Sequence, residues 1–156
     1  MGAAYFYHLT RSPLDRALPM LIERAMAKGW RVAVRTREAA RAEWLDQRLW
    51  QDHEVGFLPH GLVGGPHDGL QPVLLTTGAV PRGVSCLMTV DGADASVEEC
   101  AAAERVCIVF DGNDPSAVET ARGQWKGLTQ AGVPARYWSE ESGSWAMKSE
   151  VGSHPG

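Results

Sequence analysis

The apolar run VCIVF (residues 106–110) is followed at once by the turn sequence DGNDP (residues 111–115). A continuous apolar run of this length is typical of a strand in a parallel sheet that is covered on both faces. In the turn, Asp114 is suited to cap a helix, and Pro115 is suited to its first position. The stretch therefore predicts a buried strand that leads into a helix ending near Ala131.

Working outward from this stretch, short apolar runs alternate with segments in which apolar residues recur at helical spacing. Further strands are predicted at 3–8, 31–36, 72–76, 86–90 and 135–138. Helices are predicted from Pro13, capped by Ser12, to Gly29, and at 39–50 and 97–103. Strands that alternate with helices predict an α/β fold, with a mostly parallel sheet covered by helices on both faces.

Length and composition favour one globular domain. The chain has 156 residues, 44% of them apolar, and no apolar run reaches the ~18 residues of a membrane helix. We expect a single domain over 1–148 and a flexible tail at 149–156, because Gly, Ser and Pro near the end favour disorder. The start of the sequence does not resemble a secretory signal, so we expect a cytoplasmic protein.

The net charge limits the possible partners, and the cysteine and histidine spacings limit the possible disulfides and metal sites. Fifteen basic against nineteen acidic residues give a net charge of −4, which makes free nucleic acid a poor global partner. The three cysteines, Cys86, Cys100 and Cys107, form no C-x-x-C pair, so we expect reduced, structural thiols. The three histidines His53, His60 and His67 are seven residues apart from one another in turn, a spacing that is not typical of a metal site. We therefore expect no bound metal, and we also expect no cofactor.

No catalytic motif is present. The chain lacks a phosphate-binding P-loop, a G-x-G-x-x-G after the first strand and a G-x-S-x-G elbow. One enzymatic hypothesis stays open, a small α/β hydrolase or nucleotide-processing enzyme that uses Asp111, Asp114 and His60, because α/β enzymes place catalytic groups beyond strand ends. The same two aspartates also suit a simple turn and helix cap.

A second open hypothesis is direct binding of nucleic acid by a dense group of arginines. Nearby Glu38 and Glu43 dilute their charge. The arginines concerned are Arg31, Arg35, Arg37 and Arg41.

The last long helix carries a different pattern. Arg122 and Lys126 are four residues apart and therefore share a face, with Trp125 three residues from Arg122. A basic pair beside an indole suits a peptide that carries acidic groups and a terminal carboxylate. The alternative is an ordinary solvated helix face.

The run FLPHGL (residues 57–62), together with the pairs Leu45-Asp46 and Leu49-Trp50 ahead of it, resembles the chi subunit of bacterial DNA polymerase III holoenzyme. The aromatic first strand and a late helix carrying Trp125-Lys126 agree with it. The resemblance implies a Rossmann-like, non-catalytic accessory subunit of the clamp-loader assembly, within a holoenzyme that is a DNA-directed DNA polymerase. It implies two partners: the psi subunit, and the acidic C-terminal tail of single-stranded DNA-binding protein.

The resemblance also implies where these partners bind. The psi surface would comprise a helix-end tryptophan and an aromatic-proline loop: Trp50, Phe57, Leu58 and Pro59. The tail surface would comprise Arg122, Trp125 and Lys126 on the late helix, with a pocket floor at the end of the preceding strand formed by Val109 and Phe110.

Two positions depart from the family pattern on the tail surface. Val118 and Thr129 stand where better-known members carry basic residues. Arg136 or Lys148 is a candidate to compensate for them, a choice that the sequence leaves open.

Overall fold

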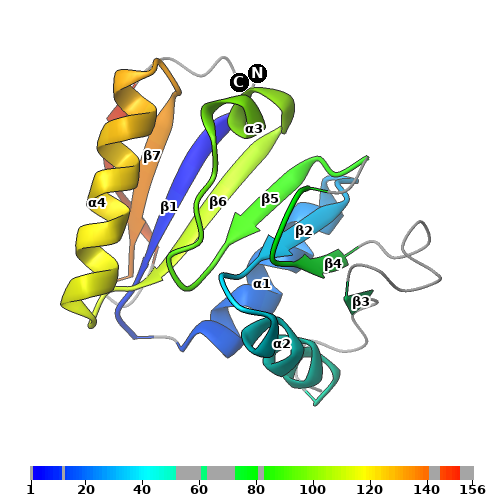
Figure 1. Ribbon diagram of the computed structural model, residues 1–156. Helices are drawn as coiled ribbons and strands as arrows, with labels where there is room; N and C mark the ends of the chain where they lie inside the picture. Colours follow the sequence, from blue (N-terminus) through cyan, green and yellow to red (C-terminus); the bar gives the residue numbers. More distant parts are fainter. Residues whose placement is uncertain are drawn as a thin grey trace.

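The computed structural model describes residues 2–11, 13–51, 61–62, 73–80, 83–140 and 145–151. Within these residues, eight strands form one sheet, and four helices pack on it (Figure 1). The strands are β1 (Ala3–Leu9), β2 (Val32–Arg35), β3 (Gly61–Leu62), β4 (Val73–Thr76), β5 (Cys86–Thr89), β6 (Arg105–Asp111), β7 (Ala135–Ser139) and β8 (Ala146–Val151). The helices are α1 (Leu14–Ala27), α2 (Ala39–Gln51), α3 (Val97–Ala102) and α4 (Pro115–Gln130).

The strand order is β3-β4-β2-β5-β6-β1-β7-β8. Every adjacent pair from β3 to β7 is parallel, and only β8 runs antiparallel, against β7. The predicted α/β fold with a mostly parallel sheet is therefore confirmed.

Two hydrophobic clusters lie on opposite faces of the sheet. The first contains Leu18 and Ile22 of α1 and Leu45 of α2, and the second contains Cys100 of α3 and Leu128 of α4. We call these the α1 face and the α4 face. Helices thus cover both faces, as the sequence predicts.

Strand β6 contributes alternately to the two faces. Cys107 and Val109 pack on the α1 face, whereas Val106, Ile108 and Phe110 pack on the α4 face. Successive side chains of a strand point to opposite sides of the sheet, so a strand buried on both sides has no polar positions. This alternation is the physical reason for the uninterrupted VCIVF run.

The helix boundaries follow local signals. Asp114 caps α4, its carboxylate accepting a hydrogen bond from the Ser116 N–H at 3.0 Å. Glycines with positive φ follow the two long helices, Gly29 at 81° and Gly132 at 90°. The start of α1 differs from the prediction by one residue: Pro13 is the N-cap instead of the first helical residue, and Ser12 lies outside the described residues.

Two short strands were not predicted. Strand β3 lies where the sequence predicts a glycine-rich loop, and its two residues are too few to show a period. Strand β8 extends to Val151 and so includes the first three residues of the expected tail. Because five of the six residues in β8 are exposed, this edge strand shows no alternation between apolar and polar residues.

Candidate functional site

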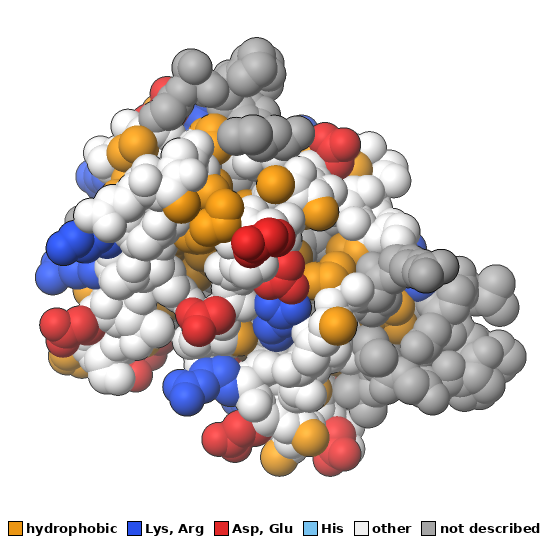
Figure 2. Space-filling model, turned by 45° about the horizontal axis from the view of Figure 1, so that its top comes forward, with side chains coloured by type: hydrophobic (Ala, Val, Ile, Leu, Met, Phe, Trp, Pro, Cys, Tyr) orange, Lys and Arg blue, Asp and Glu red, His pale blue; other side chains and the backbone are white. Residues whose placement is uncertain are grey.

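Helix α4 presents two basic side chains to solvent. Ala121 and Leu128 are buried against the α4 face, while Arg122 and Lys126 are exposed on the same side of the helix. Neither Arg122 nor Lys126 forms an ion pair with a described residue. In Figure 2, basic side chains gather on the flank of the molecule that α4 forms. The two cations are therefore available to an anionic partner.

Trp125 lies between these cations and the sheet. Its indole is half-buried and meets the ring of Phe6 on β1 edge to face, with ring centroids 5.2 Å apart. It also meets Tyr137 on β7 at 6.1 Å. The Thr129 hydroxyl donates a hydrogen bond to the Trp125 carbonyl at 2.7 Å, within α4. Trp125 is thus held by packing while part of its surface stays open.

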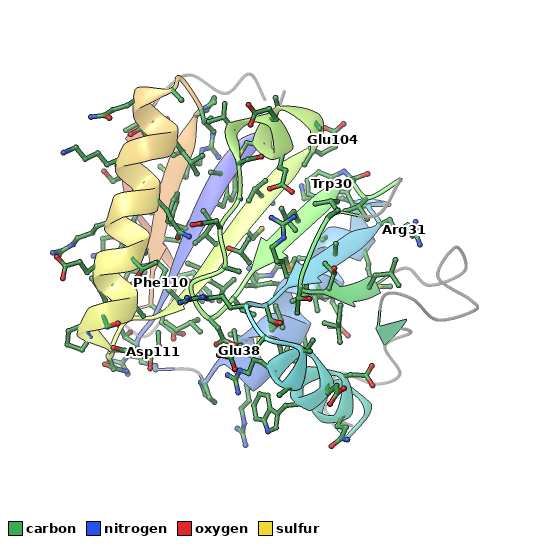
Figure 3. All side chains as sticks on the ribbon, viewed as in Figure 1. Trp30, Arg31, Glu38, Glu104, Phe110 and Asp111 are labelled. Carbon is green, nitrogen blue, oxygen red and sulfur yellow. The ribbon has the colours of Figure 1, made fainter. Side chains whose placement is uncertain are left out.

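The aromatic surface continues beyond Trp125 towards the carboxyl ends of the strands. Tyr137 lies 6.1 Å from Phe110, and the His8 ring lies 5.1 Å from Phe110. The imidazole Nδ1 of His8 forms a hydrogen bond with the Tyr137 hydroxyl. Figure 3 shows Phe110 at the end of β6 next to α4. We call Phe6, His8, Phe110, Trp125 and Tyr137 the α4 aromatic cluster.

The structure does not bring Val109 to this cluster. Its side chain is 2% exposed and packs on the α1 face, because it is the neighbour of Phe110 in one strand. The predicted pocket floor therefore loses Val109. Tyr137, which the sequence analysis did not select, lies on the same face as Phe110 and Trp125.

Tyr137 was missed for a physical reason. Its position opposite Phe6 depends on the register between β1 and β7, two strands about 130 residues apart in the chain. The one local signal is that Tyr137 lies two residues after the buried Ala135 and so shares its face.

Arg136, one of the two cations that the sequence analysis considered for the tail surface, is engaged away from α4. Its guanidinium pairs with Glu150 at 2.9 Å and donates to the Tyr5 hydroxyl at 3.0 Å on the α1 face. Val118 instead packs against the apolar cluster of the α4 face. Lys148, the other expected cation, is exposed on β8.

A crevice of about 710 Å³ lies at the carboxyl ends of β1 and β6, where α/β proteins bind phosphates. Four backbone donors here are already bound to the protein's own carboxylates. Asp111 accepts from the Asn113 N–H at 2.9 Å, and Asp114 caps α4. Glu140, at the end of β7, accepts from the N–H groups of Thr10 and Arg11 at 3.0 and 2.9 Å. These N–H groups are therefore not available to a phosphate, whereas α1, whose Pro13 and Leu14 also line the crevice, has no side-chain cap.

These contacts give two residues of the enzymatic hypothesis a structural role. Asp111 and Asp114 are exposed and serve the turn and the cap, and His60 lies outside the described residues. No group of three metal-ligating side chains occurs in the described part of the chain.

Among the arginines of the nucleic-acid hypothesis, Arg37 lies near both Arg35 and Arg41, since it lines a hollow with each, but those two are paired with carboxylates. Arg35 makes two bonds to the Glu99 carboxylate, at 2.8 and 2.5 Å, and this contact lowers the pKa of Glu99 to about 2. Arg41 pairs with Asp91 at 2.6 Å. Arg31 and Arg35 stand at opposite ends of β2, and Arg37 is exposed near the carboxyl end of that strand.

Most of the predicted psi surface lies outside the described residues. Trp50 is in the last turn of α2, but its side chain is not among those described. Phe57, Leu58 and Pro59 also lie outside them. None of the described helices is long and apolar enough to cross a membrane.

One comparison with solved structures concerns the fold, and two comparisons of sequence concern the family. The C-terminal domain of the DEAD-box protein Dbp5 superposes with a TM-score of 0.56, over 90% of this chain and 91% of that one, at 13% identity, a likeness that concerns the fold alone. "Probable DNA polymerase III subunit chi" of Rickettsia prowazekii (strain Madrid E) is 27% identical over 70 residues, which are 45% of this chain and 42% of the relative. The family described as "DNA polymerase III chi subunit, HolC" matches residues 1–136, so the chain belongs to the DNA polymerase III chi subunit family.

Proposed function

We propose that the chain is a non-catalytic accessory subunit of the DNA polymerase III clamp-loader assembly, and that it binds the acidic C-terminal tail of single-stranded DNA-binding protein. The observation that carries this proposal is the exposed pair Arg122 and Lys126 beside the half-buried Trp125. Family membership supports the replicative context. In this role the protein links the replicase to template strand that is already coated, in the bacterial cytoplasm, and touches DNA only indirectly.

In such binding, charge would mainly affect the association rate and apolar packing the dissociation rate. Exposed cations such as Arg122 and Lys126 mainly raise the association rate, and their effect falls as salt screens them. A large apolar side chain of the tail packed against Trp125, Phe110 and Tyr137 would mainly set the dissociation rate.

The psi subunit is the second proposed partner, through Trp50, Phe57, Leu58 and Pro59. An apolar side chain such as Phe57 gains most from burial in an interface. We expect Phe57→Ala to lose co-purification with psi while it keeps tail binding. An intact complex of this variant with psi would contradict the assignment.

The test of tail binding is a pull-down by this protein of the cognate single-stranded DNA-binding protein, with and without the last ten or so residues of the latter. We expect capture of the full-length protein only. Equal capture of both forms would contradict the proposal. A thermal shift induced by a nucleotide would favour the enzymatic hypothesis, and a salt-dependent gel shift of naked single strand would favour the nucleic-acid hypothesis.

A further inference from the structure

A second cavity lies on the α1 face, away from α4. Its volume is about 410 Å³, within the range of ligand pockets, and it is enclosed by the second half of α1 and by β1, β5 and β6. Its walls are mostly apolar and include the rings of Tyr5, Tyr7, Trp30 and Trp138. Figure 3 shows Trp30 ahead of β2, at the end of the sheet opposite to Phe110. We call this space the α1 cavity.

Three cations line the α1 cavity. Arg24 and Lys28 are exposed on and just after α1, and Arg105 is half-buried at the start of β6. No carboxylate is among the described residues of its lining, and none of the three cations pairs with a described carboxylate. An uncompensated group of cations around an apolar space is complementary to an anion attached to an apolar group.

Two of the three cations, Lys28 and Arg105, contact aromatic rings. The Arg105 guanidinium lies 4.0 Å from the Tyr5 ring centroid and 5.0 Å from that of Trp30. The ammonium of Lys28 lies 5.4 Å from the Trp30 centroid. These ring faces are occupied by the protein's own cations, so they do not offer the open stacking platforms that single-stranded nucleic acid uses. Arg105 is instead pre-positioned for a carboxylate.

The wall also contains the indole of Trp138. The Trp138 indole Nε1 is buried and donates to none of the described residues. Because water cannot reach this atom, it is not itself a contact point for an occupant of the cavity. Burial raises the pKa of Tyr7, so its hydroxyl stays neutral and adds no negative charge to the cavity.

We propose that the α1 cavity is a docking site for an acidic peptide segment of a partner protein, which inserts one large apolar side chain beneath α1 and sets its carboxylates against Arg24, Lys28 and Arg105. The site is separate from the α4 surface, because the two lie on opposite faces of the sheet. It therefore stands whether or not α4 binds a tail.

The test is a titration of the full chain with the peptide Ac-Asp-Asp-Asp-Leu-Phe, followed through the indole N–H signals of its tryptophans by NMR. Trp138→Phe and Trp125→Phe variants assign the two signals that matter. We expect the Trp138 signal to shift saturably, and Arg105→Gln to weaken that response about tenfold. Arg16→Gln, an exposed change on α1 outside the cavity, is the matched control and should change nothing.

The outcomes separate this site from the one on α4. Arg122→Gln should weaken the response of Trp125 and leave that of Trp138 intact. Lys28→Gln, at an exposed position, repeats the test without disturbing the half-buried Arg105. A Trp138 signal that does not move, or that moves equally with Ac-Asn-Asn-Asn-Leu-Phe-amide, would overturn the proposal. A shift of Trp138 by oligothymidylate that Arg105→Gln abolishes would also overturn it, in favour of nucleic acid.

Discussion

Trp125 of α4 and Tyr137 of β7 meet edge to face, with ring centroids 6.1 Å apart and ring planes at 80°. Through this contact the side of α4 that carries Arg122 adjoins the α4 aromatic cluster. Edge-to-face aromatic pairs stabilise beyond the area that they bury. The exposed cations of α4 thus lie beside a rigid apolar surface, an arrangement suited to a peptide with both acidic and aromatic residues.

The first prediction concerns Arg122. We expect Arg122→Ala to weaken binding of the acidic tail peptide by about three- to tenfold, since an exposed ion pair contributes about 1 kcal/mol. The wild-type affinity should also fall with added salt, and more steeply than that of the variant. Isothermal titration calorimetry at two salt concentrations measures both effects. Arg16→Ala is the control, and an unchanged affinity of Arg122→Ala would remove the α4 site.

The second prediction concerns Trp125. Because its indole packs on Phe6 and Tyr137, Trp125→Ala should cost about 2–3 kcal/mol of unfolding free energy and most of the tail affinity. Trp125→Phe keeps an aromatic ring and should retain more of both. Urea unfolding and calorimetry give the two quantities. A stable Trp125→Ala variant with full affinity would contradict the role of the indole.

The third prediction is a pH dependence. Hydrogen bonds from Arg35 lower the pKa of Glu99 from its ordinary value of 4.5 to about 2. A carboxylate with a depressed pKa in the folded state stabilises the fold above its unfolded pKa, and this stabilisation is lost as pH falls towards 2. Glu99→Gln removes the charge, while its amide oxygen can still accept from the Ser96 N–H.

We therefore expect the difference in unfolding free energy between wild type and Glu99→Gln to be constant above about pH 5 and to shrink below it. Urea unfolding at a series of pH values measures this difference. A difference that stays the same from pH 7 to pH 3 would show that the charge of Glu99 does not contribute.

Sequence patterns predicted the parts of this fold that are buried. The run at 106–110 is apolar throughout because β6 is covered on both faces. The start of α4 was predictable because the Asp114 side chain is a typical helix N-cap. Strand β8 is held by backbone bonds to β7 and exposes its side chains, so its sequence carries no comparable signal.

In the candidate site, too, the sequence predicted local features and missed those that depend on distant parts of the chain. Arg122, Trp125 and Lys126 lie on one helix, where spacing alone indicates a shared face. Val109 was grouped with Phe110 in one pocket floor, although strand alternation puts the two side chains on opposite faces. The place of Tyr137 depends on strand register, and the pairing of Arg35 with Glu99 joins residues 64 positions apart. Such long-range relations leave no local pattern.

The fourth prediction concerns Glu140, a buried carboxylate that accepts hydrogen bonds from the backbone N–H groups of Thr10 and Arg11. Glu140→Ala leaves both donors without this acceptor and should destabilise the protein by about 1–3 kcal/mol. Glu140→Gln keeps an acceptor oxygen and should recover most of that loss. Chemical denaturation compares the three proteins. Equal stability of Glu140→Ala and wild type would show that water replaces the carboxylate at no cost.

The fifth prediction compares two glycines, Gly112 in the turn after β6 and Gly123 within α4. A Cβ on Gly112 would lie 2.7 Å from the carbonyl oxygen of Leu9 and inside the contact distance of the His8 ring. The Gly112 N–H also donates to that carbonyl at 2.6 Å, so the backbone has little room to retreat. Gly112→Ala should therefore destabilise the fold by about 1–3 kcal/mol.

Gly123 is the matched control, because a Cβ there meets nothing within 4 Å. Since alanine is a better helix former than glycine, Gly123→Ala in α4 should stabilise the protein by about 0.5–1 kcal/mol. Thermal unfolding of both variants measures the two effects. If Gly112→Ala unfolds like the wild type, the turn after β6 does not pack closely against His8.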